Sequence, residues 1–262
     1  MKTAITLLTD FGTADYFVGA DKGAILSVNP QAVIVDITHE IPPQDIEAAA
    51  FTLLAAYKTF PAGTIHVAVV DPGVGSTRRP IILSANEQFF VGPDNGLFTY
   101  IYDRESSHRV FHVTNEQYFR PERSSTFHGR DIFAPVAAAL SNGLNPRTFG
   151  PGINDAVRLP VSLEPEVLKN GDVRARIIHI DRFGNCTTNI TRDLVKPNTA
   201  LYINRKTIRK FRNFYGEDST NSPFGIWGSA GFLEISVNGG SAAQVLGAKV
   251  GDEVATKGTR SR

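Results

Sequence analysis

Residues 64–75 read TIHVAVVDPGVG, and this stretch decides the fold. Its first seven residues are mostly β-branched and apolar, which is typical of a strand that is buried on both faces. Asp71 ends the apolar run, and Pro72 and Gly73 follow it as turn-forming residues. The stretch therefore predicts a buried parallel strand that leads into an acidic loop.

The same pattern recurs toward the N-terminus. Strand-like runs lie at 4–9 and 32–37, and helical patterns lie at 16–28 and 44–58. Proline and glycine stand where helices are expected to begin or end. A hairpin around Asn86-Glu87, over residues 80–91, and an alanine-rich helix over 131–140 follow. Strands that alternate with helices in this way predict a mostly parallel sheet flanked by helices.

The sequence changes character after about residue 151. Short strand patterns at 173–180, 224–227 and 232–237 recur between glycine, asparagine and proline turns, which predicts a small antiparallel β-barrel. Residues 206–222 are polar, and we expect a surface excursion with a mobile tip. The predicted fold is thus α/β, with an N-terminal α/β domain over 1–155 and a smaller C-terminal barrel domain over 160–262.

Composition narrows the class of partner. The 262 residues include 27 Lys and Arg against 26 Asp and Glu, so no net charge attracts nucleic acid or an anionic membrane. The first apolar stretch is interrupted by Asp10, too early for a signal peptide or a membrane span. Cys186 is the single cysteine, which excludes an intrachain disulfide. We expect a cytoplasmic protein that acts on a small molecule, with no nucleic-acid or membrane partner.

Carboxylates follow the predicted parallel strands. Each of the three strands ends in a carboxylate, namely Asp10, Asp36 or Asp71, and ligands bind beyond the carboxyl ends of the strands in open α/β sheets. The alternative for each acid is a capping or turn role. Arg78 and Arg79 can bring cations back to Asp71, either around a ligand or as an ion pair that pins the turn. The loop lacks the Gly-Lys-Ser/Thr ending of a phosphate-binding loop.

A second motif, SSTFHGRD at 124–131, leads into the alanine-rich helix. Gly129 permits close approach of the backbone to a ligand, and Asp131 complements the start of the helix. His128 presents an imidazole beside that helix start. A single histidine is more often structural than catalytic, but this one has an unusual setting, and the other five histidines lack a comparable one.

The C-terminal half carries groups suited to a purine or a ribose. In IDRFGNCTTN, residues 180–189, Phe183 lies between the hydrogen-bonding side chains of Asp181 and Asn185. In the glycine-rich stretch 228–240, Ser229 and Glu234 are polar anchors. The alternative for both stretches is a hairpin turn of the barrel.

Taken in order, six short motifs resemble one enzyme family. They are TDFG at 9–12, DPGVG at 71–75, GPDNG at 92–96, FHGRD at 127–131, FGN at 183–185 and VN at 237–238. The set resembles the S-adenosylmethionine hydrolases, which are homologous to fluorinases and chlorinases and form adenosine and methionine. The resemblance implies an α/β domain followed by a β-barrel. It also implies a homotrimer in which each active site lies between the N-terminal domain of one subunit and the C-terminal domain of the next.

The resemblance also implies roles for single residues. The catalytic set matches Asp71, Arg78 and His128, with Arg79 as the alternative if the loop register differs by one. The positions that match substrate-binding residues are Asp10, Asp181, Phe183, Asn185, Ser229, Glu234 and Val237. Compared with fluorinases, Asp71 replaces a tyrosine, and Gly129 replaces a serine that holds the halide. Phe17 and Gln44 replace a serine and a tryptophan, so contacts through those two positions are not carried over.

Two other functions compete with hydrolysis of S-adenosylmethionine by water. A metal-dependent nucleoside hydrolase or phosphatase would gather a divalent cation between Asp10, Asp36, Asp71 and Asp94. Arg78 and Arg79 argue against it, because cations repel a metal ion. No His/Cys set has coordination spacing, so we expect neither metal nor cofactor. The third function is a sensor that binds S-adenosylmethionine without turnover.

Overall fold

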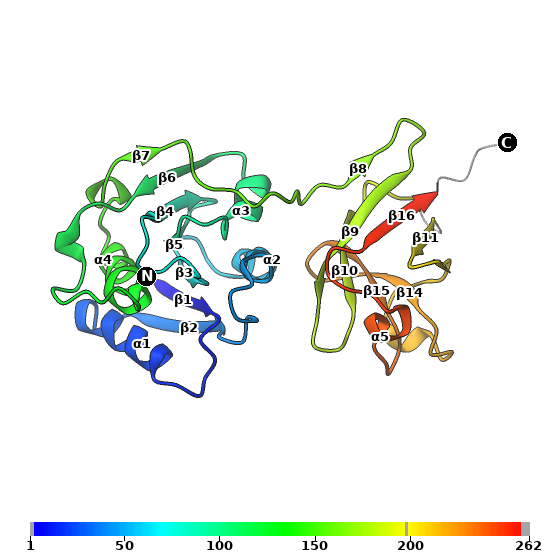
Figure 1. Cartoon of the computed structure of the whole chain (residues 1–262), viewed down its shortest axis with the longest axis horizontal. Coiled ribbons are helices and arrows are strands. Elements are labelled where there is room, and N and C mark those ends of the chain that lie inside the picture. Colours follow the sequence, from blue (N-terminus) through cyan, green and yellow to red (C-terminus); the bar gives the residue numbers. More distant parts are fainter. Residues whose placement is uncertain (1–2, 197–198, 258–262) are drawn as a thin grey trace. The chain divides into compact units, whose positions relative to one another are not determined.

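The computed structural model describes residues 3–196 and 199–257. The chain separates into two compact units, residues 1–161 and 162–262, which Figure 1 shows in blue to green and in yellow-green to red. Each unit has its own sheet and its own apolar core. The predicted domain bounds, 1–155 and 160–262, stay a prediction.

Unit 1 contains a seven-stranded mixed sheet. Its strands are β1 (Ala4–Thr9), β2 (Val33–Thr38), β3 (Ile65–Val69), β4 (Pro80–Ala85), β5 (Gln88–Pro93), β6 (His108–His112) and β7 (Gly152–Ile153). The strand order is β2-β1-β3-β5-β4-β6-β7. Strands β2, β1, β3 and β5 are parallel, whereas β4, β6 and β7 pair antiparallel. The acidic loop after β3 therefore begins at the carboxyl end of a central parallel strand.

The helices of unit 1 pack in two pairs. They are α1 (Phe17–Val28), α2 (Ile46–Ala56), α3 (Thr99–Arg104), α4 (Ala134–Ser141), the 3₁₀ turns η1 (Tyr57–Thr59), η2 (Glu116–Tyr118) and η4 (Pro146–Thr148), and a π-helical turn, η3 (Gly129–Phe133). α1 packs on α4, and α2 packs on α3 (Figure 1). Alternate residues of β1, Ile5 and Leu7, join α1 and α4 in one buried cluster.

Several predicted elements of unit 1 are confirmed. β1 has the predicted bounds, and the hairpin of β4 and β5 turns through Asn86 and Glu87, which both have positive φ angles as a two-residue hairpin turn requires. Two details were wrong. The helix predicted from residue 131 begins as η3 two residues earlier. Asp36 lies within β2 rather than at its end, because β2 is an edge strand whose exposed side accommodates a charge.

Unit 2 is a barrel-like, mostly antiparallel sheet. Its strands are β8 (Glu166–Val167), β9 (Val173–Ile180), β10 (Cys186–Thr191), β11 (Ala200–Ile203), β12 (Lys206–Ile208), β13 (Phe211–Arg212), β14 (Phe224–Trp227), β15 (Phe232–Ser236) and β16 (Glu253–Lys257). A 3₁₀ turn, η5 (Tyr215–Glu217), and a short helix, α5 (Ala242–Leu246), complete the unit. The predicted fold class, α/β followed by a smaller antiparallel barrel, is confirmed.

The segment 206–222 is more ordered than predicted. It forms β12, β13 and η5, and Asp218 within it is almost fully buried. Hydrogen bonds from Lys210 and Arg212 reach the Asp218 carboxylate, which ties the residues around β13 to the residue that follows η5. Within the described part of the chain, no helix has the length and apolar character needed to cross a membrane.

Candidate active site

The loop after β3 folds back on itself and meets the loop before η3. The amide of Val74 donates to the carbonyl of Asp71, and the amide of Ser76 donates to that of Gly73, both at 3.1 Å. Gly75 has a φ of +79°, and a Cβ on it would lie 2.3 Å from the carbonyl oxygen of Ser125. Glycine at this position therefore lets the two predicted motifs come into contact.

Arg78 joins Asp71 to His128. Its Nε donates to Oδ2 of Asp71 at 2.9 Å, and its Nη2 lies 2.7 Å from Nδ1 of His128. The side chains of Asp71 and Arg78 are only 4% and 9% exposed. The guanidinium also lies over the ring of Phe133, 5.2 Å from its centroid. The structure thus assembles three residues that are up to 57 positions apart in the sequence, with Arg78 in the centre.

The hydrogen bond from Arg78 fixes the protonation of His128. Arginine has only donors, so Nδ1 of His128 must accept. Burial, with the nearby Arg78 charge, lowers the pKa of His128. At neutral pH the imidazole is therefore uncharged and carries its proton on Nε2. In this geometry His128 offers a donor, and the free carboxylate lone pairs of the cluster belong to Asp71.

Arg79 points elsewhere. Its Nε donates to Oδ2 of Asp94 at 2.8 Å, and its Nη1 donates to Asp155 at 2.8 Å. Asp94 also accepts a hydrogen bond from the amide of Val157. Arg79 thus anchors the segment around residue 155 to the hairpin, and Arg78 is the arginine that contacts both Asp71 and His128.

A buried carboxylate supports the loop that carries His128. Asp131 is fully buried, accepts the amide of Ser124 at 2.8 Å and accepts Nε of Arg130 at 2.6 Å. His128 is the N-cap residue of the π-helical turn η3, a type of turn that is frequent at functional sites. Asp10 lies just after β1, the strand beside β3, and its Oδ2 accepts the amide of Gln44 at 2.8 Å.

The four acids of the metal hypothesis have other partners. Asp36 pairs with Lys22 and His39, Asp71 pairs with Arg78, Asp94 pairs with Arg79, and Asp10 accepts a backbone amide. Three of these carboxylates are therefore already neutralised by neighbouring cations, which disfavours a shared divalent ion. Over residues 3–196 and 199–257, no three His, Cys, Asp or Glu side chains gather as a metal site would require.

Unit 2 contains a cavity of about 520 Å³. Its lining consists of Asp181, Phe183, Asn185, Tyr215, Val237, Gly239 and Gly240, four of which were predicted to bind substrate. The Asp181 carboxylate accepts the amides of Phe183 and Asn185 and the Asn185 side chain, each at 2.9 Å. This turn leaves the Phe183 ring 76% exposed beside the cavity. An exposed aromatic plane next to fixed polar groups is suited to a heterocyclic ring.

Glu234 and Ser229 lie outside that lining. The hydroxyl of Tyr215, which does line the cavity, donates to Oε2 of Glu234 at 3.1 Å, and burial raises the pKa of Glu234. Ser229 is exposed in the turn between β14 and β15. Cys186 is buried, which raises the pKa of its thiol to about 12 and agrees with its having no nucleophilic role. The sequence did not identify Tyr215.

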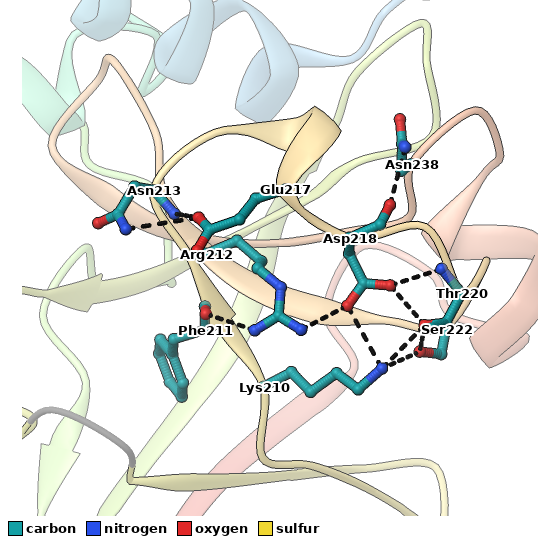
Figure 2. A network of polar contacts seen from close by, with 9 residues as sticks. All are labelled: Lys210, Phe211, Arg212, Asn213, Glu217, Asp218, Thr220, Ser222 and Asn238. Carbon is teal, nitrogen blue, oxygen red and sulfur yellow. Dashed lines mark hydrogen bonds and ion pairs between the residues drawn. The ribbon is translucent and has the colours of Figure 1, made fainter.

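Figure 2 shows a network of polar contacts among residues close in sequence to the lining of this cavity. The Asp218 carboxylate accepts Arg212 at 2.7 Å and the amide of Thr220 at 2.8 Å, and hydrogen bonds from Thr220 lower its pKa. The carbonyl of Asp218 accepts the side chain of Asn238 at 2.8 Å. Asn238 lies between Val237 and Gly239, two residues of the lining. The network therefore connects Asp218, which follows η5 and its residue Tyr215, to the stretch of the lining around Asn238.

Family models match both units. The SAM hydroxide adenosyltransferase N-terminal domain matches residues 5–150, which include Asp71, Arg78 and His128. The C-terminal domain of the same family matches residues 175–255, which include the cavity of unit 2. The chain belongs to the SAM hydroxide adenosyltransferase family.

Several known proteins are similar to this chain over nearly its whole length. The (R)-S-adenosyl-L-methionine hydrolase of Methanocaldococcus jannaschii is 38% identical over 95% of this chain and 94% of its own length. The enzyme of the same name from Thermus thermophilus is 37% identical over 94% and 96%. A crystal structure of an uncharacterized conserved protein from Thermotoga maritima matches with a TM-score of 0.90 and 37% identity, over 96% of this chain and 99% of that one.

Proposed function

We propose that this protein hydrolyses S-adenosyl-L-methionine to adenosine and L-methionine. The observation that carries the proposal is the buried cluster in which Arg78 joins Asp71 to His128. The relatives named as hydrolases of this substrate, aligned along almost the full chain, support it.

The reaction needs an activated water and little else. Water attacks C5′ of the ribose, the C5′–S bond breaks, and its electron pair goes to the sulfur, which leaves as the neutral thioether of methionine. Because the sulfur of the substrate already carries the positive charge of a sulfonium, it needs no proton in order to leave. The protein has to hold the water in line with the departing sulfur and to accept its proton.

We assign these tasks to the three residues of the cluster. The Nε2 proton of His128 donates to the water oxygen, because Nδ1 is engaged by Arg78. A free lone pair of Asp71 accepts a water proton, so Asp71 acts as the base. Arg78 keeps both partners aligned and stabilises hydroxide character as it develops. Of the two candidate bases that the sequence leaves open, the proposal selects Asp71.

Substrate recognition is assigned mainly to unit 2. Phe183 stacks on the adenine, with Asp181 and Asn185 fixing its turn and contributing hydrogen bonds. Asp10 binds the ribose hydroxyls from the end of β1. The remaining predicted contacts are Ser229, Glu234 and Val237, of which Glu234 acts through Tyr215.

Product analysis tests the proposal. The purified chain, treated with EDTA and incubated with S-adenosyl-L-methionine, is expected to yield adenosine and methionine in equal amounts. Activity that disappears in EDTA and returns with a divalent cation would favour the metal-dependent hydrolase instead. Binding by calorimetry without any product would identify a sensor.

The proposal includes a cytoplasmic homotrimer with shared sites, in which unit 1 of one subunit works with unit 2 of the next. The single buried cysteine agrees with a reducing compartment. Light scattering should give three times the 28.5 kDa mass of the chain. Refolding a mixture of Arg78→Ala and Phe183→Ala chains should restore activity at low substrate, because some sites then combine two intact halves. A fully active monomer would contradict the trimer.

A further inference from the structure

Asp21 is a buried acid that the proposed mechanism does not use. It lies on α1 next to the buried residues Ala24 and Ile25, and its side chain is fully enclosed. Neither of its carboxyl oxygens has a hydrogen-bond partner among the residues that the structure describes. Buried polar groups without partners are rare in native proteins, because their desolvation is uncompensated. The position of Asp21 therefore needs a specific reason.

The Asp21 carboxyl points at the backbone beside His128. A Cβ placed on Gly129 would lie 3.1 Å from each carboxyl oxygen of Asp21 and 3.3 Å from the ring of Phe127. The carboxyl group thus occupies the space that a side chain at 129 would take. Gly129 is the first residue of η3 and directly follows His128, so this contact is made at the turn that presents the imidazole to Arg78.

The surroundings keep this carboxyl uncharged near neutral pH. Burial raises the pKa of Asp21 to about 8, with Asp131 raising it further and Arg130 opposing the shift. The ionisable residues on α1 and at its N-cap are Lys22, which pairs with Asp36, and Tyr16. Next to Gly129 stands His128, and Arg120 lies 3.6 Å from the Asp131 carboxylate. α4, which packs on α1, has no ionisable side chain. Arg130 is hydrogen-bonded to Asp131, so its charge offsets only part of the cost of ionising the buried Asp21 carboxyl.

We propose that Asp21 is a positioning residue for His128, whose uncharged carboxyl fills the space beside Gly129 and holds the turn from which the imidazole contacts Arg78. The kinetic consequence rests on the proposed hydrolase function, whereas the contact itself does not. When Asp21 ionises, the anion can no longer stay in this apolar contact without a partner, and the turn must rearrange. Turnover is therefore expected to fall as the pH rises above about 8, through kcat rather than KM.

Asp21→Asn tests the role of the charge, because asparagine has the same shape and does not ionise. The wild type should lose at least half of its kcat between pH 7.5 and 9, and the midpoint of this fall should move by more than one pH unit or vanish in Asp21→Asn. Asp103→Asn removes a surface carboxylate that pairs with Arg158 and should keep the wild-type profile. An unchanged midpoint in Asp21→Asn would overturn the proposal.

A second pair of variants tests the contact itself. Gly129→Ala places a methyl group against the carboxyl and should lower kcat at least tenfold. Asp21→Ala with Gly129→Ala should recover at least half of that loss on the logarithmic scale, since the new methyl group fills the vacated space. A double variant no better than Gly129→Ala alone would overturn the proposal, even if Asp21→Asn does not fold.

A measurement without substrate separates this proposal from the hydrolase function. The imidazole NMR signal of His128, assigned by its absence in His128→Gln, should shift with a midpoint near pH 8 in the wild type and not in Asp21→Asn. This result in a chain without turnover would refute the hydrolase function and support the Asp21 contact. A signal that is the same in both proteins across this range would overturn the positioning role.

Discussion

The buried cluster of unit 1 and the open cavity of unit 2 differ in how their side chains are arranged before a ligand binds. Asp71 and Arg78 are almost completely buried and already paired, so their charges are oriented in advance. Phe183 and Tyr215 are 76% and 45% exposed, and their apolar surface is still in contact with solvent. Preoriented charge lowers a reaction barrier, whereas exposed apolar surface gains free energy when a ligand covers it. On the proposed function, the first region performs the chemistry and the second supplies most of the affinity.

The largest effect should come from unit 1. Arg78→Ala, Asp71→Ala and His128→Ala should each lower kcat by about 10²–10⁴-fold while substrate affinity stays within a few fold, because these contacts act chiefly on the transition state. Double variants should cost little more than the worst single one, since the three residues act on one water. Turnover assays beside calorimetric titration measure both quantities.

Arg79→Ala is the matched control for that series. Its partners are Asp94 and Asp155 rather than His128, so kcat should change far less than in Arg78→Ala. Near-normal turnover in His128→Ala would remove the histidine from the mechanism and leave Asp71 and Arg78 alone.

In unit 2 the expected effect is on binding. Phe183→Ala should raise the Kd for S-adenosylmethionine by roughly 5- to 150-fold, the range expected for loss of one stacked base, with kcat at saturation little changed. Val167→Ala, which alters another exposed apolar residue of unit 2 outside the cavity lining, should leave the Kd unchanged. A Phe183→Ala protein with low kcat and normal Kd would break the division between the two regions.

Acid should affect the cluster before it affects the cavity. The pKa of His128 is lowered by burial and by Arg78, so its neutral form prevails at pH 7 and a proton is taken up only below pH 6.5. That proton would occupy Nδ1 and displace the hydrogen bond from Arg78. We expect kcat to fall below this pH while Kd changes less. Because the unfolded state takes up this proton first, the contribution of His128 to stability also falls as the pH drops below 6.5.

The smallest effect should come from the support of the cavity. Asp218→Asn removes the charge that holds Arg212 and Lys210, so the segments that carry Tyr215 and Val237 into the lining should loosen. A modest rise in Kd, smaller than that of Phe183→Ala, and an unchanged kcat are expected from the same titration. A loss of kcat in Asp218→Asn would show that the cavity affects the chemistry directly.

Strand patterns and the order of the motifs predicted much of the fold and of the candidate site. The β-branched run at 4–9 predicted β1, and the short strand patterns between turn residues predicted β9 and β14, each with its bounds, since local pattern and burial agree there. The choice between Arg78 and Arg79 depended on the loop geometry, which sequence spacing does not determine. Tyr215 was missed because it stands in a polar segment whose order comes from contacts with Asp218.

The sequence does contain a pattern that marks Asp21 as unusual. Residues 21, 24 and 25 have helical spacing, which places Asp21 on the same face as Ala24 and Ile25. An acid on the apolar face of a helix conflicts with burial, and such conflicts tend to mark functional positions. The contact of Asp21 with the backbone of Gly129 joins segments that are distant in the sequence, so only the structure reveals it.

A single-turnover reaction in ¹⁸O-labelled water tests the proposed attack most directly. With enzyme in excess over S-adenosyl-L-methionine, direct attack by the water held at Asp71, Arg78 and His128 puts one ¹⁸O into the 5′-hydroxyl of adenosine in the first turnover. If the Asp71 carboxylate attacked C5′ itself and the resulting ester were then hydrolysed at its carbonyl carbon, the first adenosine would carry unlabelled oxygen from the protein. Mass spectrometry of the adenosine distinguishes the two: labelled product is predicted, and unlabelled product would contradict the water mechanism.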